Sequence, residues 1–161
     1  MRHPPIPPAD HGFLLPRIIA RDHLHLPCYH ANLCADHPGC QLQSVCPCGQ
    51  TTTSPGSTPD TLCLHIPLTL HLRDACGHAR TASTTLDVET CMPHCMHHTP
   101  CHLTWVAPDV RLLECACPDS CCFRAKLSIC ADIYLLRMEP CLSRPPKPPC
   151  PQLPLYPPPM H

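Results

Sequence analysis

The sequence predicts a small all-β protein, and three observations support this fold class. Prolines make up 25 of the 161 residues, and because each one fixes φ and removes a backbone donor, long helices are disfavoured. Apolar and polar residues alternate over 62–73 and 122–139, which is the period of a strand with one buried face. Turn-forming residues follow or precede both stretches. We therefore expect an antiparallel sandwich or half-barrel built from two hairpins.

Composition divides the chain into three regions. Residues 1–60 are rich in proline and cysteine and end in the linker-like "GQTTTSPGSTPD", so we expect irregular structure there. Residues 61–141 carry the sustained alternation and should form the β-domain. Residues 142–161 are a Pro-rich tail that favours polyproline II and has no core of its own.

The first hairpin is predicted from "LCLHIPLTLHLR" and "TASTTLDVE", which both alternate with period two. Asp74 and Gly77 lie between them and suit a tight turn. Pro67 falls on the polar face of the first strand, and because proline cannot donate to a ladder, it predicts an edge strand or a bulge.

The second hairpin is predicted from "DVRLLECAC", the turn "PDS" and the long "CFRAKLSICADIYLLRME". A helix would distribute the apolar residues of the last string all round its axis, whereas a strand places them on one side. The strand interpretation is therefore preferred. Trp105, the single tryptophan, is expected to anchor the core or this hairpin.

Charge and hydropathy exclude two classes of partner. The formal net charge is −1, and no basic stripe provides the footprint expected for nucleic-acid binding. The most apolar early segment, "FLLPRIIA", is interrupted by Pro16 and Arg17 and is too short for a transmembrane span or a signal peptide. We expect no nucleic-acid or membrane partner, and synthesis in the cytoplasm without a signal peptide.

The spacing of the 17 cysteines excludes several families of sites. No pair forms a C-x-x-C motif, which counts against zinc ribbons, thioredoxin-type centres and common iron–sulfur motifs. Because the number is odd, at least one thiol must stay free, bind metal or join another chain. The neighbours Cys121 and Cys122 are expected to have different partners, since adjacent cysteines do not easily bridge each other.

The string "CMPHCMHHTPCH" is the strongest candidate metal site. Its prolines exclude a continuous helix, so thiolates and imidazoles can converge from a loop and would suit Zn²⁺, or Cu(I) if the methionines take part. The alternative, a loop with disulfides and solvated histidines, is favoured because the spacing fits no known ligand pattern. "CACPDSCC" at 115–122 is a second cluster of the same kind. The candidate ligands are Cys91, His94, Cys95, His97, His98, Cys101 and His102.

Catalysis has little support in the sequence. No G-x-S-x-G, phosphate loop or H-E-x-x-H occurs, and no single Cys–His pair is distinguished among many. We expect no enzyme, no catalytic residues and no cofactor beyond a possible Zn or Cu ion. The scattered aspartates suit turns or exposed strand positions; they are Asp74, Asp87, Asp109, Asp119 and Asp132.

The strings "LHIPLTLHLRDACGHARTASTTLDVE" and "FRAKLSICADIYLLRMEPC" resemble the repeated β-domain of sporulation proteins that assemble the spore coat in endospore-forming bacteria. The likeness covers residues 61–141 and includes Pro67 in an apolar strand followed by a turn with Asp74 and Gly77. The cysteine density and the Pro-rich tail depart from that domain. The resemblance implies coat-like assembly with other chains and deposition on the spore surface.

A conflict between cysteine content and location is resolved by this resemblance. Disulfide frameworks belong to oxidising compartments, yet no export signal is visible. A coat protein is made in a reducing cell and meets oxidant after lysis, so its thiols could then cross-link chains. The first hypothesis is thus a non-enzymatic structural or assembly protein that self-associates through cysteines; the alternative is a Cys/His-rich protein that binds Zn or Cu.

Overall fold

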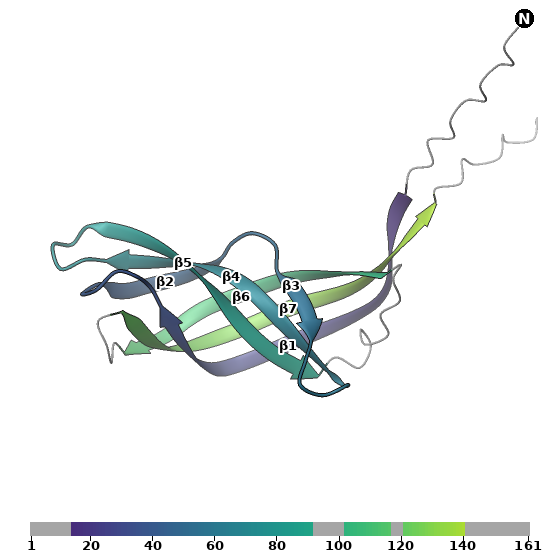
Figure 1. Cartoon of the computed structure of the whole chain (residues 1–161), viewed down its shortest axis with the longest axis horizontal. Coiled ribbons are helices and arrows are strands. Elements are labelled where there is room, and N and C mark those ends of the chain that lie inside the picture. Colours follow the sequence, from purple (N-terminus) through teal and green to yellow (C-terminus); the bar gives the residue numbers. More distant parts are fainter. Residues whose placement is uncertain (1–13, 92–101, 117–120, 141–161) are drawn as a thin grey trace, which may run out of the picture.

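The computed structural model describes residues 14–91, 102–116 and 121–140, which form seven strands in two antiparallel sheets (Figure 1). The described residues include no helix, and so none that could cross a bilayer. The all-β prediction is confirmed. The tail at 142–161 lies outside the described residues.

The first sheet is built around β4 (Thr61–Arg73), which forms the predicted hairpin with β5 (Ala79–Cys91). On the other side of β4 lie two short strands in succession, β2 (Gln41–Pro47) and β3 (Thr52–Pro55). β4 is therefore a central strand. No register shift falls at Pro67, so the expectation that it marks an edge strand or a bulge is wrong.

Pro67 fits a central strand because of where β2 and β3 meet. The pairing of β2 ends at Leu68 and that of β3 begins at His65, so Pro67 faces the break between them. Its carbonyl accepts a hydrogen bond from the Cys48 N–H on that side. In an antiparallel ladder the N and C=O of one residue point toward the same neighbouring strand. The nitrogen of Pro67 therefore points toward the break between β2 and β3, where no ladder hydrogen bond requires a donor.

The second sheet has the order β1–β7–β6, with β1 at Leu14–Cys34, β6 at His102–Ala116 and β7 at Cys122–Pro140. β6 and β7 form the predicted second hairpin. β1 pairs with the whole of β7, from Leu14 opposite Pro140 to Cys34 opposite Cys122. In Figure 1 the start of β1 and the end of β7 rise together away from the sandwich.

The expectation of irregular structure in residues 1–60 is wrong for β1, β2 and β3. Register shifts in β1 between Ile18 and Ala20, and between Leu26 and Tyr29, interrupt its alternation. Pro27 lies within the second shift, and β1 is a sheet edge, where a missing donor is tolerated. Because the bulges and prolines interrupt the alternation, the sequence did not predict this long strand. The described sandwich begins at Leu14, well before residue 61.

The core lies between the two sheets and is formed by one face of each. Along β4, and along β7 as far as Leu135, every second residue is buried, as the alternation predicted. The largest side chains with almost no exposed surface are Phe123, Leu33, Leu64, Ile66, Leu68, Leu70, Leu72, Leu127, Ile129, Ile133 and Val88. Leu33 comes from β1, so the N-terminal region contributes to the core.

A disulfide joins Cys34 at the end of β1 to Cys122 at the start of β7. The two residues are register partners with Cα atoms 4.2 Å apart, although 88 positions separate them in sequence. The Ala35 N–H donates to the Cys121 carbonyl beside this bond. The expectation that Cys121 and Cys122 do not bridge each other agrees with this pairing.

Candidate functional site

The predicted metal loop is described only at its ends. Cys91 is the last residue of β5 and is exposed, and the backbone of His102 begins β6. The candidate ligands between them, His94, Cys95, His97, His98 and Cys101, lie outside the described residues. Whether this loop gathers metal ligands therefore stays a prediction.

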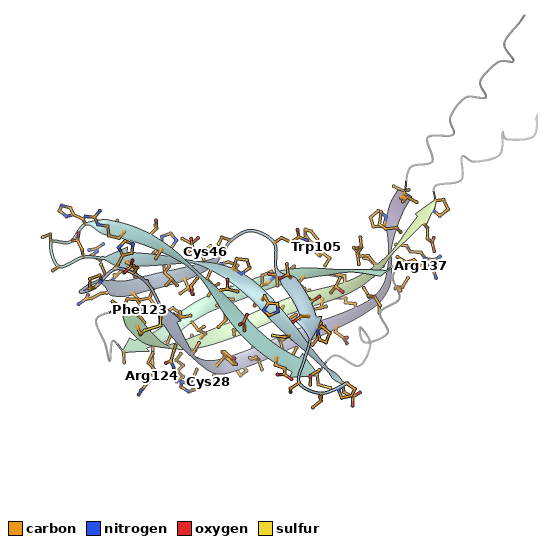
Figure 2. All side chains as sticks on the ribbon, in the orientation of Figure 1. Cys28, Cys46, Trp105, Phe123, Arg124 and Arg137 are labelled. Carbon is orange, nitrogen blue, oxygen red and sulfur yellow. A yellow bond between two sulfur atoms is a disulfide. The ribbon has the colours of Figure 1, made fainter. Side chains whose placement is uncertain are left out.

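Exposed thiols are spread over the sandwich. Cys28 lies in β1, Cys46 in β2, Cys76 in the β4–β5 turn and Cys91 at the end of β5, and Figure 2 labels the first two on different parts of the molecule. At about 3.3 Å per residue, the ends of the 13-residue β5 are roughly 40 Å apart. Cys76 and Cys91 thus lie far beyond the Cα distance of about 7 Å that a disulfide within one chain permits.

Large apolar side chains are exposed on the outer face of the β1–β7–β6 sheet. Leu136 in β7 is opposite Ile18 in β1 and Leu103 in β6. Two residues further along β6, Trp105 is opposite Tyr134 of β7. Directly opposed residues share a face of the sheet. Ile18, Leu103 and Trp105 are each more than half exposed. We call these five residues the outer apolar patch.

Trp105 belongs to this patch and not to the core. It alternates along β6 with the buried Val106 and is itself 53% exposed, and Figure 2 labels it on the surface. The expectation of a core anchor is wrong because the odd positions of this part of β6 face solvent. Exposed apolar surface that spans several strands is typical of an interaction site.

The β4–β5 turn brings together one carboxylate, one thiol and one imidazole. Ligand atoms of Asp74, Cys76 and His78 all lie within 4.8 Å of one another. Asp74 Oδ1 accepts the backbone N–H groups of Cys76 at 3.0 Å and His78 at 2.8 Å, and Gly77 supplies the positive φ of +85° that the turn requires. The spacing D-x-C-x-H could have identified this cluster from the sequence.

Electrostatics keep Asp74 in the form that binds cations. The hydrogen bond from the His78 N–H, followed by the nearby His78 ring and the Cys76 N–H, lowers the pKa of Asp74. Arg80 Nε lies 3.4 Å from Asp74 Oδ2 and would have to move aside for a metal ion. Carboxylate, thiolate and imidazole are all ligands of Zn²⁺, so the donor set fits that ion with one coordination position left open.

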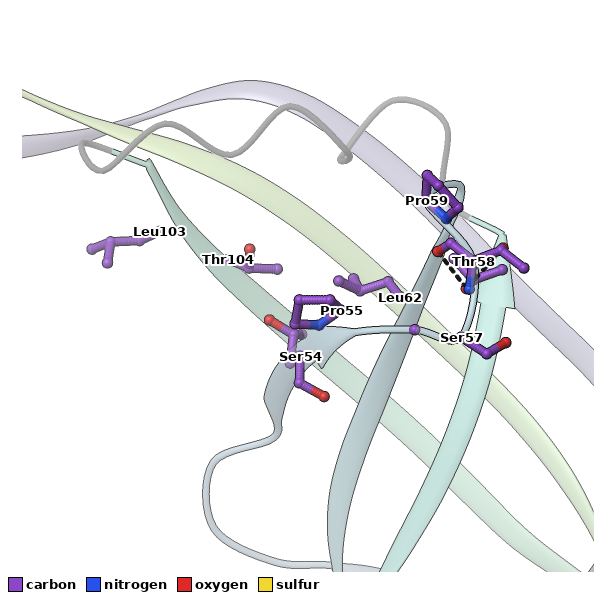
Figure 3. Close-up of a pocket in the computed structure, with 11 residues that line it drawn as sticks. Ser54, Pro55, Ser57, Thr58, Pro59, Leu62, Leu103 and Thr104 are labelled. Atoms are coloured by element: carbon purple, nitrogen blue, oxygen red, sulfur yellow. Dashed lines mark hydrogen bonds between the residues drawn. The ribbon is translucent and has the colours of Figure 1, made fainter.

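A hollow of about 700 Å³ lies between the β3–β4 turn and the start of β6. Figure 3 shows Pro55, Thr58 and Pro59 on one side and Leu103 and Thr104 on the other. The turn is held by Glu89, whose Oε1 accepts the N–H of Ser57 at 2.7 Å and the hydroxyl of Thr61 at 2.8 Å. The Ser57 hydroxyl also donates to Oε1. This bond, followed by those from the Thr61 hydroxyl and the Ser57 N–H, lowers the pKa of Glu89.

Three comparisons, with family models, with curated proteins and with solved structures, found no match to this chain. The resemblance to spore-coat domains therefore rests on its sequence strings alone.

Proposed function

We propose that this chain is an assembly protein in which a β-sandwich carries cysteines that cross-link it to other copies of itself. The observation that supports this proposal best is the set of exposed thiols Cys28, Cys46, Cys76 and Cys91, which lie on different elements. Cys76 and Cys91 occupy opposite ends of one hairpin, so a single chain offers bonds in more than one direction. That arrangement suits an extended assembly better than a closed dimer.

The outer apolar patch supports association between copies before thiols react. Ile18, Leu103 and Trp105 expose most of their side chains on one sheet face, and burying apolar surface contributes about 25 cal/mol per Å². A contact of this kind would hold thiols near one another, after which an oxidant converts them to disulfides. The resemblance to spore-coat domains is consistent with this role and suggests deposition on the spore surface.

A non-reducing gel tests the proposal. After air oxidation, the wild-type chain should give a ladder of covalent multimers that collapses to monomer with reductant. Serine at positions 28, 46, 76 and 91 together should thin the ladder, because these four thiols are exposed. C40S is the matched control, since Cys40 is only 6% exposed and its loss should leave the ladder intact. A wild-type chain that stays monomeric after oxidation would contradict the proposal.

A second candidate function, zinc binding, is favoured by the cluster of Asp74, Cys76 and His78. Protein purified without oxidant should contain about one zinc per chain, and Co²⁺ in its place should give the absorption of a thiolate complex. C76S should abolish that absorption if the turn binds the metal. The triple variant C91S/C95S/C101S should abolish it if the predicted loop does, and the absence of metal from the wild type removes this candidate.

A further inference from the structure

A serine, a histidine and an aspartate from three neighbouring strands form a chain of hydrogen bonds on the outer face of the β4 sheet. Ser54 Oγ in β3 is 2.7 Å from His65 Nε2 in β4. His65 Nδ1 is in turn 2.6 Å from Asp87 Oδ1 in β5. The register places His65 directly opposite Asp87. Neither contact follows from sequence spacing, since 11 and 22 positions separate the partners.

We propose that Ser54 is an activated nucleophile that accepts an acyl group from an ester, with His65 as its general base and Asp87 as a positioning residue. The Asp87 carboxylate can only accept, so it holds the proton of His65 on Nδ1 and leaves Nε2 free to accept the Ser54 hydroxyl proton. This is the order of roles in serine nucleophiles of unrelated folds. The inference goes beyond the proposed assembly role.

The neighbouring thiol does not compete for this role. Cys63 is the register partner of Ser54. Its pKa is raised by partial burial and by the negative charges of Asp87 and Glu89, and a hydrogen bond with the Ser54 side chain opposes this only in part. A thiol is a nucleophile only as the thiolate. Cys63 therefore stays protonated near neutral pH, which leaves the serine as the reactive group beside His65.

Access and surroundings indicate the substrate class. Ser54 is one of the residues that line the 700 Å³ hollow, together with Pro55, Leu62 and Leu103 (Figure 3), whereas His65 and Asp87 are not among them. The His65 side chain is 33% exposed, so reagent can approach the hydrogen-bonded pair. The lining combines apolar residues with serine and threonine hydroxyls and includes no charged side chain, so it favours a small uncharged ester over a charged substrate.

The chemical step needs no further reactant than the ester. The Ser54 Oγ–carbon bond forms while the proton moves from Oγ to His65 Nε2. The carbon–oxygen bond of the ester then breaks, and the leaving alcohol takes the proton from His65. The product is an ester on Ser54, and water can remove the acyl group through the same base.

Covalent labelling tests the inference directly. The full chain, with its thiols blocked by N-ethylmaleimide, is treated with a fluorophosphonate probe and digested for mass spectrometry. Ser54 should be labelled in preference to Ser44, Ser57 and Ser83, and S54A should lose the label. H65Q should slow labelling by about 100-fold or more, the usual contribution of a general base. H71Q, which changes an exposed histidine on the same face of β4, should have no effect.

The positioning role of Asp87 is tested by one variant that removes its charge and one that retains it. D87N should slow labelling at least about tenfold because the amide can hold the wrong tautomer of His65, and D87E should restore it in part. Labelling of Ser54 in wild type no faster than that of Ser57, or unchanged in H65Q, would overturn the inference. The wild-type comparison does not depend on any variant folding, and because all thiols are blocked, its outcome is independent of cross-linking.

Discussion

Alternate residues of β4 serve different purposes. Leu64, Ile66 and Leu68 have no exposed surface, whereas Cys63 and His65 between them lie on the half-buried opposite face. The first set contributes to stability through burial. The second set carries thiol and imidazole chemistry where reagents can reach it. A single strand thus separates packing from reactivity by the period of two that every strand has.

Removing a buried side chain should show this division. L64A should lower the free energy of unfolding by about 2 to 5 kcal/mol, because it deletes apolar contacts and leaves a cavity. T85A, on the exposed face of the neighbouring β5, should change it by about 0.5 kcal/mol or less. Urea denaturation followed by circular dichroism measures both. Equal effects of the two variants would show that the inner face of β4 is not packed as described.

Pairing between distant elements defines the second sheet. β1 and β7 are joined along their full length, and the Cys34–Cys122 disulfide closes one end of that pairing. β1 is an edge strand with two register shifts, and such a strand gains less from its ladder than a central one. The covalent bond compensates for this weakness by limiting how far β1 can separate from β7.

Loss of the disulfide should destabilise the oxidised chain. In the chain-entropy model, closing a loop of 88 residues contributes about 4 to 5 kcal/mol. The double variant C34S/C122S should therefore unfold at a clearly lower urea concentration than wild type, and reductant should have little further effect on its midpoint. C28S is the control and should keep the wild-type midpoint. If C34S/C122S also kept it, the bond would have no role in stability.

The whole molecule is a sandwich whose surface carries several carboxylates with lowered pKa. Asp132 Oδ1 is 2.9 Å from His23 Nδ1 and 3.1 Å from Arg21, and these hydrogen bonds, that of His23 first, lower its pKa. Hydrogen bonding to Arg137 lowers the pKa of Glu139. Hydrogen bonds from residues of the adjacent turns lower the pKa of Asp74 and of Glu89. Each group is more acidic in the folded chain, so its contribution depends on pH.

Acid should destabilise the molecule with a defined sign. A carboxylate whose folded pKa is depressed contributes stability that is present above its ordinary pKa, 3.8 for Asp132 and 4.5 for Glu139. That stability is lost as pH falls through the lower folded value. The thermal midpoint should therefore drop below about pH 4, and D132N should show a smaller drop than wild type. D60N, which changes an exposed carboxylate in the β3–β4 turn, should keep the wild-type drop. A midpoint independent of pH between 5 and 3 would contradict the assignment.

The sequence by itself determined the fold class and both hairpins, because alternation and turn chemistry act between neighbours in the chain. β4 with β5 and β6 with β7 pair across short connections, and their period of two was visible in the strings. β1 could not be found in this way. Two register shifts and its prolines interrupt the alternation, and its partner β7 begins 88 positions after β1 ends.

Only the tertiary structure decided which polar side chains meet. The exposure of Trp105 depends on which face of β6 turns outward, and the contact of Ser54 with His65 and Asp87 depends on the register of three strands. A shift of one residue in any of them would send these side chains to the other face. Local sequence fixes whether a residue lies in a strand, but its neighbours across the sheet follow from how the apolar faces pack, which is a property of the whole chain.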